Sequence, residues 1–204
     1  MWARRLAGCR KSVDVWQTLI AVQAMVVAPH EHAHTLVKFA ALCRAKGRMR
    51  LCARTLGELI DGTLSEGDFE LRALPHEPIV AHAVAKYLWA SGRRPQAKEL
   101  LRRLLREREA ELERPLLLKV VLALGRWNES EREPHDRADA LAAETLRCYA
   151  AATRHGPHEY KAWHAWALFN FELAAALEAR LGERGAADAP VSYTHLTLPT
   201  KRIV

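Results

Sequence analysis

Apolar side chains recur at steps of three and four residues along most of the chain, which is the spacing of one buried face of an α-helix. In the first segment, Leu6, Val13, Trp16 and Ile20 follow this spacing and predict a helix that runs to about Val27. Because the same period continues through the following segments, the sequence predicts an all-α protein.

Glycine and proline divide this pattern into helical hairpins. Pro29 suits the first turn of a second helix, which stops near Gly47 and is followed by a partner helix. A connecting loop over 63–78 leads to a second hairpin, whose helices cover 79–88 and 95–112. The chain therefore alternates between helices and short turns.

Two further units follow toward the C-terminus. A helix over 116–124 is predicted to end at Gly125, before a polar break. The fourth unit pairs a helix over 138–153 with one over 160–181.

A repeated spacing relates the first two hairpins. The interval from Gly47 to Cys52 equals that from Gly92 to Ala97, so each hairpin places a small residue one turn into its second helix. Tetratricopeptide-type repeats share this feature. The predicted fold is an α-solenoid of tetratricopeptide-like helical hairpins, whose units bury their faces on one another.

A change in composition marks the domain boundary. We assign 1–182 to the helical repeat segment, as a partial domain. The segment 183–204 has no helical period and looks like a translated adapter or assembly read-through. We predict that it is unstructured, non-native and without function.

The charge and the cysteine content indicate the class of protein and its compartment. The 204 residues include 31 Lys+Arg and 24 Asp+Glu, and the net charge of +7 allows a polyanionic partner without establishing one. No stretch approaches the roughly 20 apolar residues of a membrane span. The four cysteines contain no CxxC pair and are interpreted as reduced thiols, which predicts a cytosolic or nuclear protein.

Candidate catalytic and metal chemistry is weak. The sequence contains no phosphate-binding glycine loop, HExxH, GxSxG or kinase HRD and DFG motif, so this chain is not predicted to catalyse a reaction. His30 and His34 share a helix face without a third ligand, which disfavours a metal site. Glutamates interleave the arginines of the 95–112 helix, as in Glu99 and Arg103, and favour a solvated face over a nucleic-acid surface.

Aromatic residues gather at the start of the last predicted helix. Tyr160, Trp163 and Phe171 follow helical spacing, with Trp166 on a flanking face. Such a stripe usually packs in the core, and a groove for a partner is the alternative.

Several blocks carry a resemblance to a known family. They are Val26 to Glu31, Leu36 to Cys43, the set Pro78, Val80, Ala83, Lys86 and Trp89, the turn Leu124-Gly125-Arg126-Trp127, and Tyr160-Lys161-Ala162-Trp163-His164-Ala165-Trp166-Ala167. In this order they resemble the FAT region of the target of rapamycin (TOR) kinases, members of the phosphatidylinositol kinase-related kinase family. The resemblance covers roughly residues 1 to 175.

The resemblance implies that the chain is a fragment of a protein serine/threonine kinase acting in nutrient and growth signalling. In the family, the FAT repeats clamp a C-terminal kinase domain, which would hold the ATP and which this chain lacks. The expected partners are that kinase domain, neighbouring helical repeats and TOR complex subunits. The implied location is cytoplasmic, extending to endomembrane surfaces or the nucleus through the parent complex.

The resemblance also implies a ligand. Similar FAT regions hold inositol hexakisphosphate in a basic pocket, and the matching positions here are Lys86, Arg93 and Lys161. A polyphosphate needs several cations that converge from different helices. An arginine that the family places just before the aromatic block is replaced by Pro157 in this chain.

Two other interpretations remain open from the residues. One is a free-standing tetratricopeptide-like adaptor that binds proteins. The other is a basic helical-repeat protein that binds RNA, which the unequal repeats and mixed helix charges disfavour.

Overall fold

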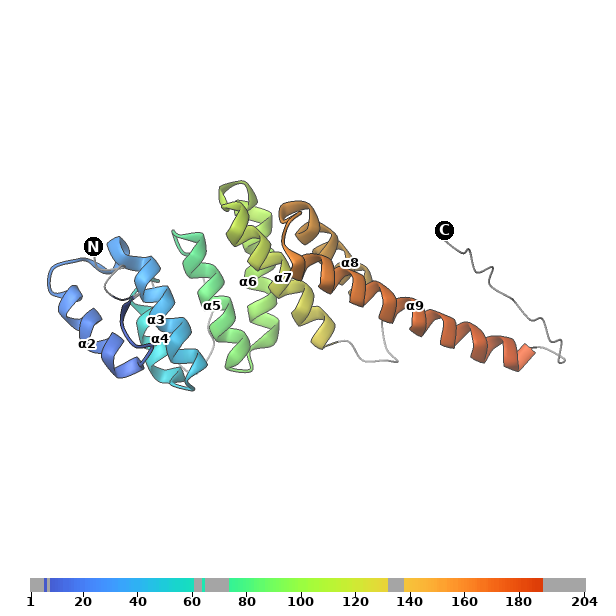
Figure 1. Cartoon of the computed structure of the whole chain (residues 1–204), viewed down its shortest axis with the longest axis horizontal. Helices are drawn as coiled ribbons and strands as arrows, with labels where there is room; N and C mark the ends of the chain where they lie inside the picture. Colours follow the sequence, from blue (N-terminus) through green and yellow to red (C-terminus); the bar gives the residue numbers. More distant parts are fainter. Residues whose placement is uncertain (1–5, 7, 61–63, 65–73, 132–137, 189–204) are drawn as a thin grey trace, which may run out of the picture.

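The helices stand next to one another in chain order, and together they form an elongated row (Figure 1). The computed structural model describes residues 6, 8–60, 64, 74–131 and 138–188. Its helices are α2 (Val13–Ala24), α3 (Ala33–Ala45), α4 (Met49–Gly57), α5 (Pro78–Ala90), α6 (Arg94–Arg108), α7 (Arg114–Ser130), α8 (Ala138–His155) and α9 (Tyr160–Asp188), with 3-10 turns η1 (Pro29–His32) and η2 (Glu109–Glu111). Every regular element in these ranges is helical, which confirms the all-α prediction.

The closest packing is between helices that follow each other as hairpins. α3 packs on α4, α5 on α6, and α7 on α8, while α5 also contacts α3 and α4 and thereby joins the first two hairpins. The long α9 begins against α8 and extends from the end of the row (Figure 1). This stacking of hairpins confirms the predicted α-solenoid.

The turns of the first two hairpins have the same geometry. Gly47 and Gly92 have φ angles of 72° and 84°, a left-handed conformation that costs glycine little. The amide of Arg48 donates to Cys43 O, and the amide of Arg93 donates to Leu88 O, both at 2.9 Å. These bonds close a Schellman motif at the end of α3 and of α5.

The small residues predicted to follow these turns are buried. Cys52 is 1% and Ala97 is 0% exposed, so each lets its helix approach the preceding one closely. Large apolar residues fill the remaining core, including Leu36, Leu56, Leu88, Leu101, Leu104, Tyr149 and Phe169. Burying one such side chain contributes about 1.5–3 kcal/mol relative to exposure.

The first helix differs from the prediction. Leu6 is buried, but it precedes α2, which begins only at Val13 after an extended Ser12 and ends at Ala24. A continuous helix from Leu6 to Val27 was therefore wrong. The chain leaves the helical conformation over residues 9–12, and Ser12 favours the position just before a helix.

The predicted end of the third helix at Gly125 was also wrong. α7 continues through this glycine to Ser130. A Cβ atom on Gly125 would lie 2.6 Å from Tyr149 Cε1 and 3.3 Å from Cys148 Cβ. The glycine therefore serves the close approach of α8 to α7, and it does not mark a turn.

The aromatic stripe of the last helix faces outward, so its predicted place in the core was wrong. Tyr160 and Phe171 are each 74% exposed, and Trp163 is 46% exposed. The residues that α9 buries are Ala162 and Phe169, and the Phe169 ring meets Tyr149 edge-on at 5.8 Å. A face with a small residue fits against α8 better than the larger aromatic face.

The C-terminal boundary also shifts. Helix α9 extends to Asp188, past the end of the segment predicted at 182. The rest of the tail, 189–204, lies outside the described residues.

Charged side chains pair across the surface of α6. Arg102 donates two hydrogen bonds of 2.9 Å to Glu144 of α8. Glu99 pairs with Arg106, and Arg103 pairs with Glu107, both at 2.8 Å. These pairs support the prediction of a solvated helix face.

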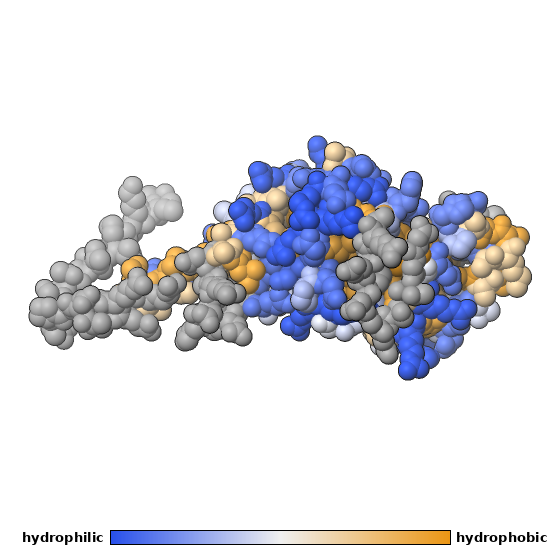
Figure 2. Space-filling view, turned by 180° about the vertical axis from the view of Figure 1, so that it is seen from behind, coloured by the Kyte–Doolittle hydropathy of each residue, from blue (hydrophilic) through white to orange (hydrophobic). Residues whose placement is uncertain are grey.

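The apolar surface lies mainly at the two ends of the row. Figure 2 shows a largely hydrophilic middle, with hydrophobic residues over α2 and α9. The exposed ones include Val22, Met25, Val26, Phe171 and Leu181. Among the helices described here, none is long and apolar enough to span a membrane.

Candidate polyanion site

One face of α5 and one face of α7 border adjoining cavities. On α5 this face carries Ile79, His82, Ala83 and Lys86, which are spaced like one side of a helix. On α7 it carries Leu118, Lys119, Leu122, Ala123, Arg126 and Trp127. The Trp127 ring stacks on Trp89 of α5, with centroids 4.6 Å apart and planes 4° from parallel, and this contact ties the two helices together.

Both cavities have a basic lining. The first, of about 270 Å³, lies between α3, α5 and α7, and α3 adds Lys38 and Arg44 to its walls. The second, of about 420 Å³, lies between α5, α7 and the start of α9. Lys86 and Lys119 border both cavities, so the positive surface is continuous from one to the other.

The second cavity has an excess of positive charge. Lys86, Lys119, Arg126 and Lys161 line it with one carboxylate, Glu159, which leaves four minus one, or +3. Within the described ranges, none of the four cations forms an ion pair. Helices α5, α7 and α9 thus bring unneutralised cations to one place.

The nearby positive charges help to lower the pKa values of two groups, Lys86 and His82. Burial lowers the pKa of Lys86, and the charges of Arg44, Lys119 and Arg126 lower it further. Burial together with the nearby cations lowers the pKa of His82 to about 3, so this imidazole is neutral at physiological pH. A bound anion would relieve the repulsion that acts on Lys86.

The structure brings together two of the three predicted ligand residues. Lys86 and Lys161 line the same cavity, although they come from α5 and α9. Arg93 is not among the residues that line either cavity. It follows the Schellman turn, where its guanidinium carbon lies 5.6 Å from the Tyr87 ring centroid and its Nε donates to Ser91 Oγ at 3.4 Å.

The end of α5 explains the position of Arg93. Lys86 and Arg93 would share a face if the helix continued, because seven residues make two turns. The helix ends at Ala90, and the left-handed Gly92 turns the chain away.

Sequence reasoning missed Lys119 and Arg126. Their spacing of seven, on the same side as Leu118 and Leu122, was a usable signal once α7 is known to continue past Gly125. The predicted end at Gly125 placed Arg126 in a turn and hid this face.

The lining suits binding better than bond-making chemistry. It consists of cations over an apolar floor formed by residues such as Leu118 and Leu122. In the part of the chain that the structure describes, no three His, Cys, Asp or Glu side chains group to hold a metal ion. The arrangement can hold a polyanion by charge-assisted hydrogen bonds.

Comparison with known proteins identifies the family. The sequence model of the FAT domain matches residues 1–196. Serine/threonine-protein kinase mTor of Drosophila melanogaster is 31% identical over 95% of this chain, TOR2 of Saccharomyces cerevisiae 34% over 86%, and TOR of Arabidopsis thaliana 32% over 83%. The chain spans 8% of the length of each of these relatives. It therefore belongs to the FAT domain family, in the form that TOR-type protein kinases contain.

Proposed function

We propose that this chain is part of the FAT scaffold of a TOR-type serine/threonine kinase, where it clamps and regulates the kinase domain and supports complex assembly. The observation that carries the proposal is the α-solenoid of a FAT domain, matched over most of its length by TOR kinases. A row of paired helices offers a long, rigid surface for another domain. The free thiols of buried Cys43 and Cys52 suit a cytoplasmic location.

A segment exchange tests the scaffold role. This chain would replace the matching segment of yeast TOR2, and the purified chimera would be assayed for kinase activity and assembly. We expect activity above that of a chimera carrying a flexible Gly/Ser linker of equal length. Equal, background activity of the two chimeras would contradict the proposal. The adaptor alternative predicts no dependence of kinase activity on this chain.

The second part of the proposal concerns the ligand. Inositol hexakisphosphate is an expected occupant of the cavity between α5, α7 and α9, because its phosphates need several cations from separate helices. Lys86, Lys119, Arg126 and Lys161 supply these cations. Arg93 is not assigned to the inositol hexakisphosphate site, because it is not among the residues that line this cavity.

Thermal unfolding with and without inositol hexakisphosphate tests this site. Ligand at about a hundred times its Kd should stabilise the folded protein by about 2.7 kcal/mol. Lys86→Ala and Lys161→Ala should remove most of this stabilisation, whereas Arg93→Ala should retain it. Arg54→Ala, at an exposed position on α4, is the matched control for loss of one charge. An unchanged unfolding temperature in the parent protein would refute the site.

A further inference from the structure

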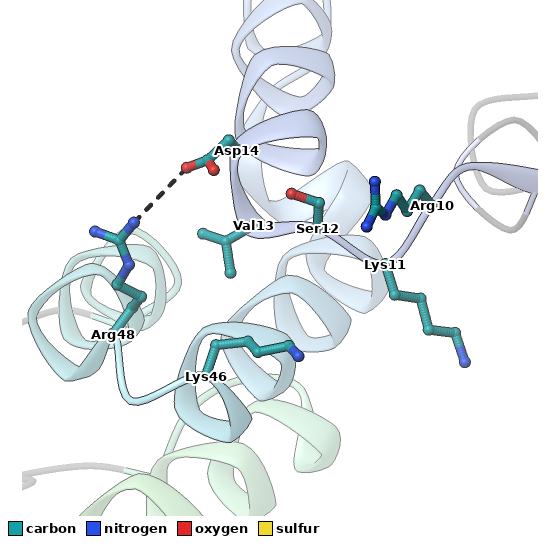
Figure 3. A pocket seen from close by; sticks show the side chains of 7 residues that line it. All are labelled: Arg10, Lys11, Ser12, Val13, Asp14, Lys46 and Arg48. Carbon is teal, nitrogen blue, oxygen red and sulfur yellow. Dashed lines mark ion pairs between the residues drawn. The ribbon is translucent and has the colours of Figure 1, made fainter.

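A second basic cavity lies near the other end of the molecule, at the N-terminal end of α2 (Figure 3). We call it the α2 cavity. It has a volume of about 480 Å³ and lies between residues 10–14 and the turn that joins α3 to α4. Arg10, Lys11, Lys46 and Arg48 line it, so folding brings together cations that are far apart in the sequence.

Among the described residues that line the α2 cavity, one carboxylate, that of Asp14, neutralises little of this charge. Four cations and Asp14 leave four minus one, or +3. Asp14 lies 3.8 Å from Arg48, but both side chains are mostly exposed, so the pair is weak. Among the residues that the structure describes, Arg10, Lys11 and Lys46 have no ion-pair partner.

The side chains divide into two groups. Figure 3 shows Asp14 directed toward Arg48 on one side of the α2 cavity. The Arg10 guanidinium lies beside Ser12, and the Lys46 side chain extends below Ser12 from the end of α3, in the direction away from Arg48. This second side has cations without a carboxylate.

The backbone adds to the positive potential on that side. Ser12 precedes α2 in an extended conformation, and its side chain makes no capping hydrogen bond. The first amides of a helix lack intrahelical acceptors and carry partial positive charge. The opposing end of α3 is less negative than a free terminus, because the amides of Lys46, Gly47 and Arg48 already occupy its last carbonyls.

We propose that the α2 cavity is a phosphate-binding site for the phosphomonoester groups of a small polyphosphate, held by Arg10, Lys46 and the first amides of α2. Phosphate oxygens accept hydrogen bonds from guanidinium, ammonium and backbone amides at once. A ligand that carried a carboxylate in place of the phosphate would offer fewer acceptor oxygens and less negative charge. The site is separate from the cavities lined by Lys86, because within the described part of the chain they share no lining residue with it.

Pyrophosphate is the probe for the first experiment. The 204-residue chain carrying Lys86→Ala and Lys161→Ala, which weaken the other basic cavity, would be titrated and followed by amide NMR. We expect saturable shifts of the Val13, Asp14 and Val15 amides. Arg10→Gln with Lys46→Gln should weaken pyrophosphate binding about tenfold or more. Arg54→Gln with Arg50→Gln, on exposed positions of α4, removes the same charge and should leave it unchanged.

One substitution separates ligand binding from folding. Asp14→Asn removes the carboxylate that lines the α2 cavity among the described residues, so it should tighten pyrophosphate binding. The same change removes an acid from the first turn of α2 and should lower thermal stability slightly. If Asp14 had a purely structural role, Asp14→Asn would not raise the affinity for pyrophosphate while it lowers thermal stability.

Vesicles distinguish the source of the phosphate. Phosphatidylcholine vesicles with and without phosphatidylinositol 4-phosphate would be tested for flotation of the same proteins. Flotation that needs Arg10 and Lys46 supports a lipid headgroup, whereas pyrophosphate binding without flotation supports a soluble ligand. Absence of pyrophosphate binding, or equal binding by the Arg10→Gln and Lys46→Gln protein, would overturn the proposal. Neither result would affect the inositol hexakisphosphate site.

Discussion

Replacing Gly125 with alanine tests whether this glycine is present for packing. By helix propensity alone, alanine inside α7 would stabilise the protein by about 1 kcal/mol. The structure predicts the opposite sign, because the added Cβ would lie 2.6 Å from Tyr149 Cε1 and 2.9 Å from its Cδ1. Contacts this short force a displacement.

The Tyr149 ring has little freedom to move away. It is fully buried, its hydroxyl donates to Glu129, and Phe169 lies edge-on at 5.8 Å. Overpacking a fixed core site costs about 1–3 kcal/mol, and the upper part of that range applies here. After the gain in propensity, we expect a net loss of about 1–2 kcal/mol.

Urea unfolding followed by far-ultraviolet circular dichroism measures this loss. With a slope of about 2 kcal/mol per M, the midpoint should fall by about 0.5–1 M. Gly8→Ala is the control, because its Cβ would meet nothing within 4 Å. In a Tyr149→Leu background the cost of Gly125→Ala should shrink or change sign. A raised midpoint for Gly125→Ala alone would refute the packing argument.

Three other predictions concern turns, a charge pair and thiols. Gly47→Ala and Gly92→Ala should each lower unfolding stability by about 1–2 kcal/mol, because both positions have positive φ, and urea midpoints unchanged from the parent protein would count against this. The hydrogen bond from Arg102 lowers the pKa of Glu144 below its usual 4.5, so this pair stabilises the protein above that pH and loses its effect as the pH falls through the lowered value. Glu144→Gln should therefore reduce the fall in stability below pH 4.5, as measured by urea unfolding at several pH values, and an unaltered pH profile would contradict the assignment. Burial raises the pKa of Cys43, Cys52 and Cys148 to about 11. At pH 8, only the partly exposed Cys9 should therefore react rapidly with a disulfide reagent. Rapid reaction of several thiols in the folded protein would show that these cysteines are not buried.

The parts of the fold that the sequence predicted are those set by local rules. A glycine followed five residues later by a small residue marks both Schellman turns, because the left-handed position and the close helix contact are independent requirements of the same hairpin. Pro78 similarly begins α5, at a position where a missing amide costs nothing. Local rules therefore located these two hairpins and most of their ends.

The errors arose where tertiary packing decides the outcome. Gly125 resembles a helix terminator in isolation, and only the presence of Tyr149 shows that it makes room for a ring. On α9 the aromatic residues suggested the buried face, whereas the structure buries the face of Ala162 and Phe169. When two faces of a helix are apolar, hydrophobicity alone does not show which face is buried. The shape of the neighbouring helix decides which face packs against it.

The candidate site shows the same division between local and tertiary information. The period of α5 places Lys86 beside Ile79 and Ala83, so its helix face follows from the sequence. Which cations meet it depends on the order of packing, because Lys119 arrives on α7 and Lys161 on α9. A chain with net charge +7 has many cations that are merely solvated, whereas the four that line this cavity are brought together by folding and share one lining carboxylate, Glu159, among the described residues. On α6, arginines pair with glutamates four residues away, as Arg103 does with Glu107. On α7, Lys119 and Arg126 lie among leucines instead. This contrast between helix faces is the signal that a sequence offers for a polyanion site.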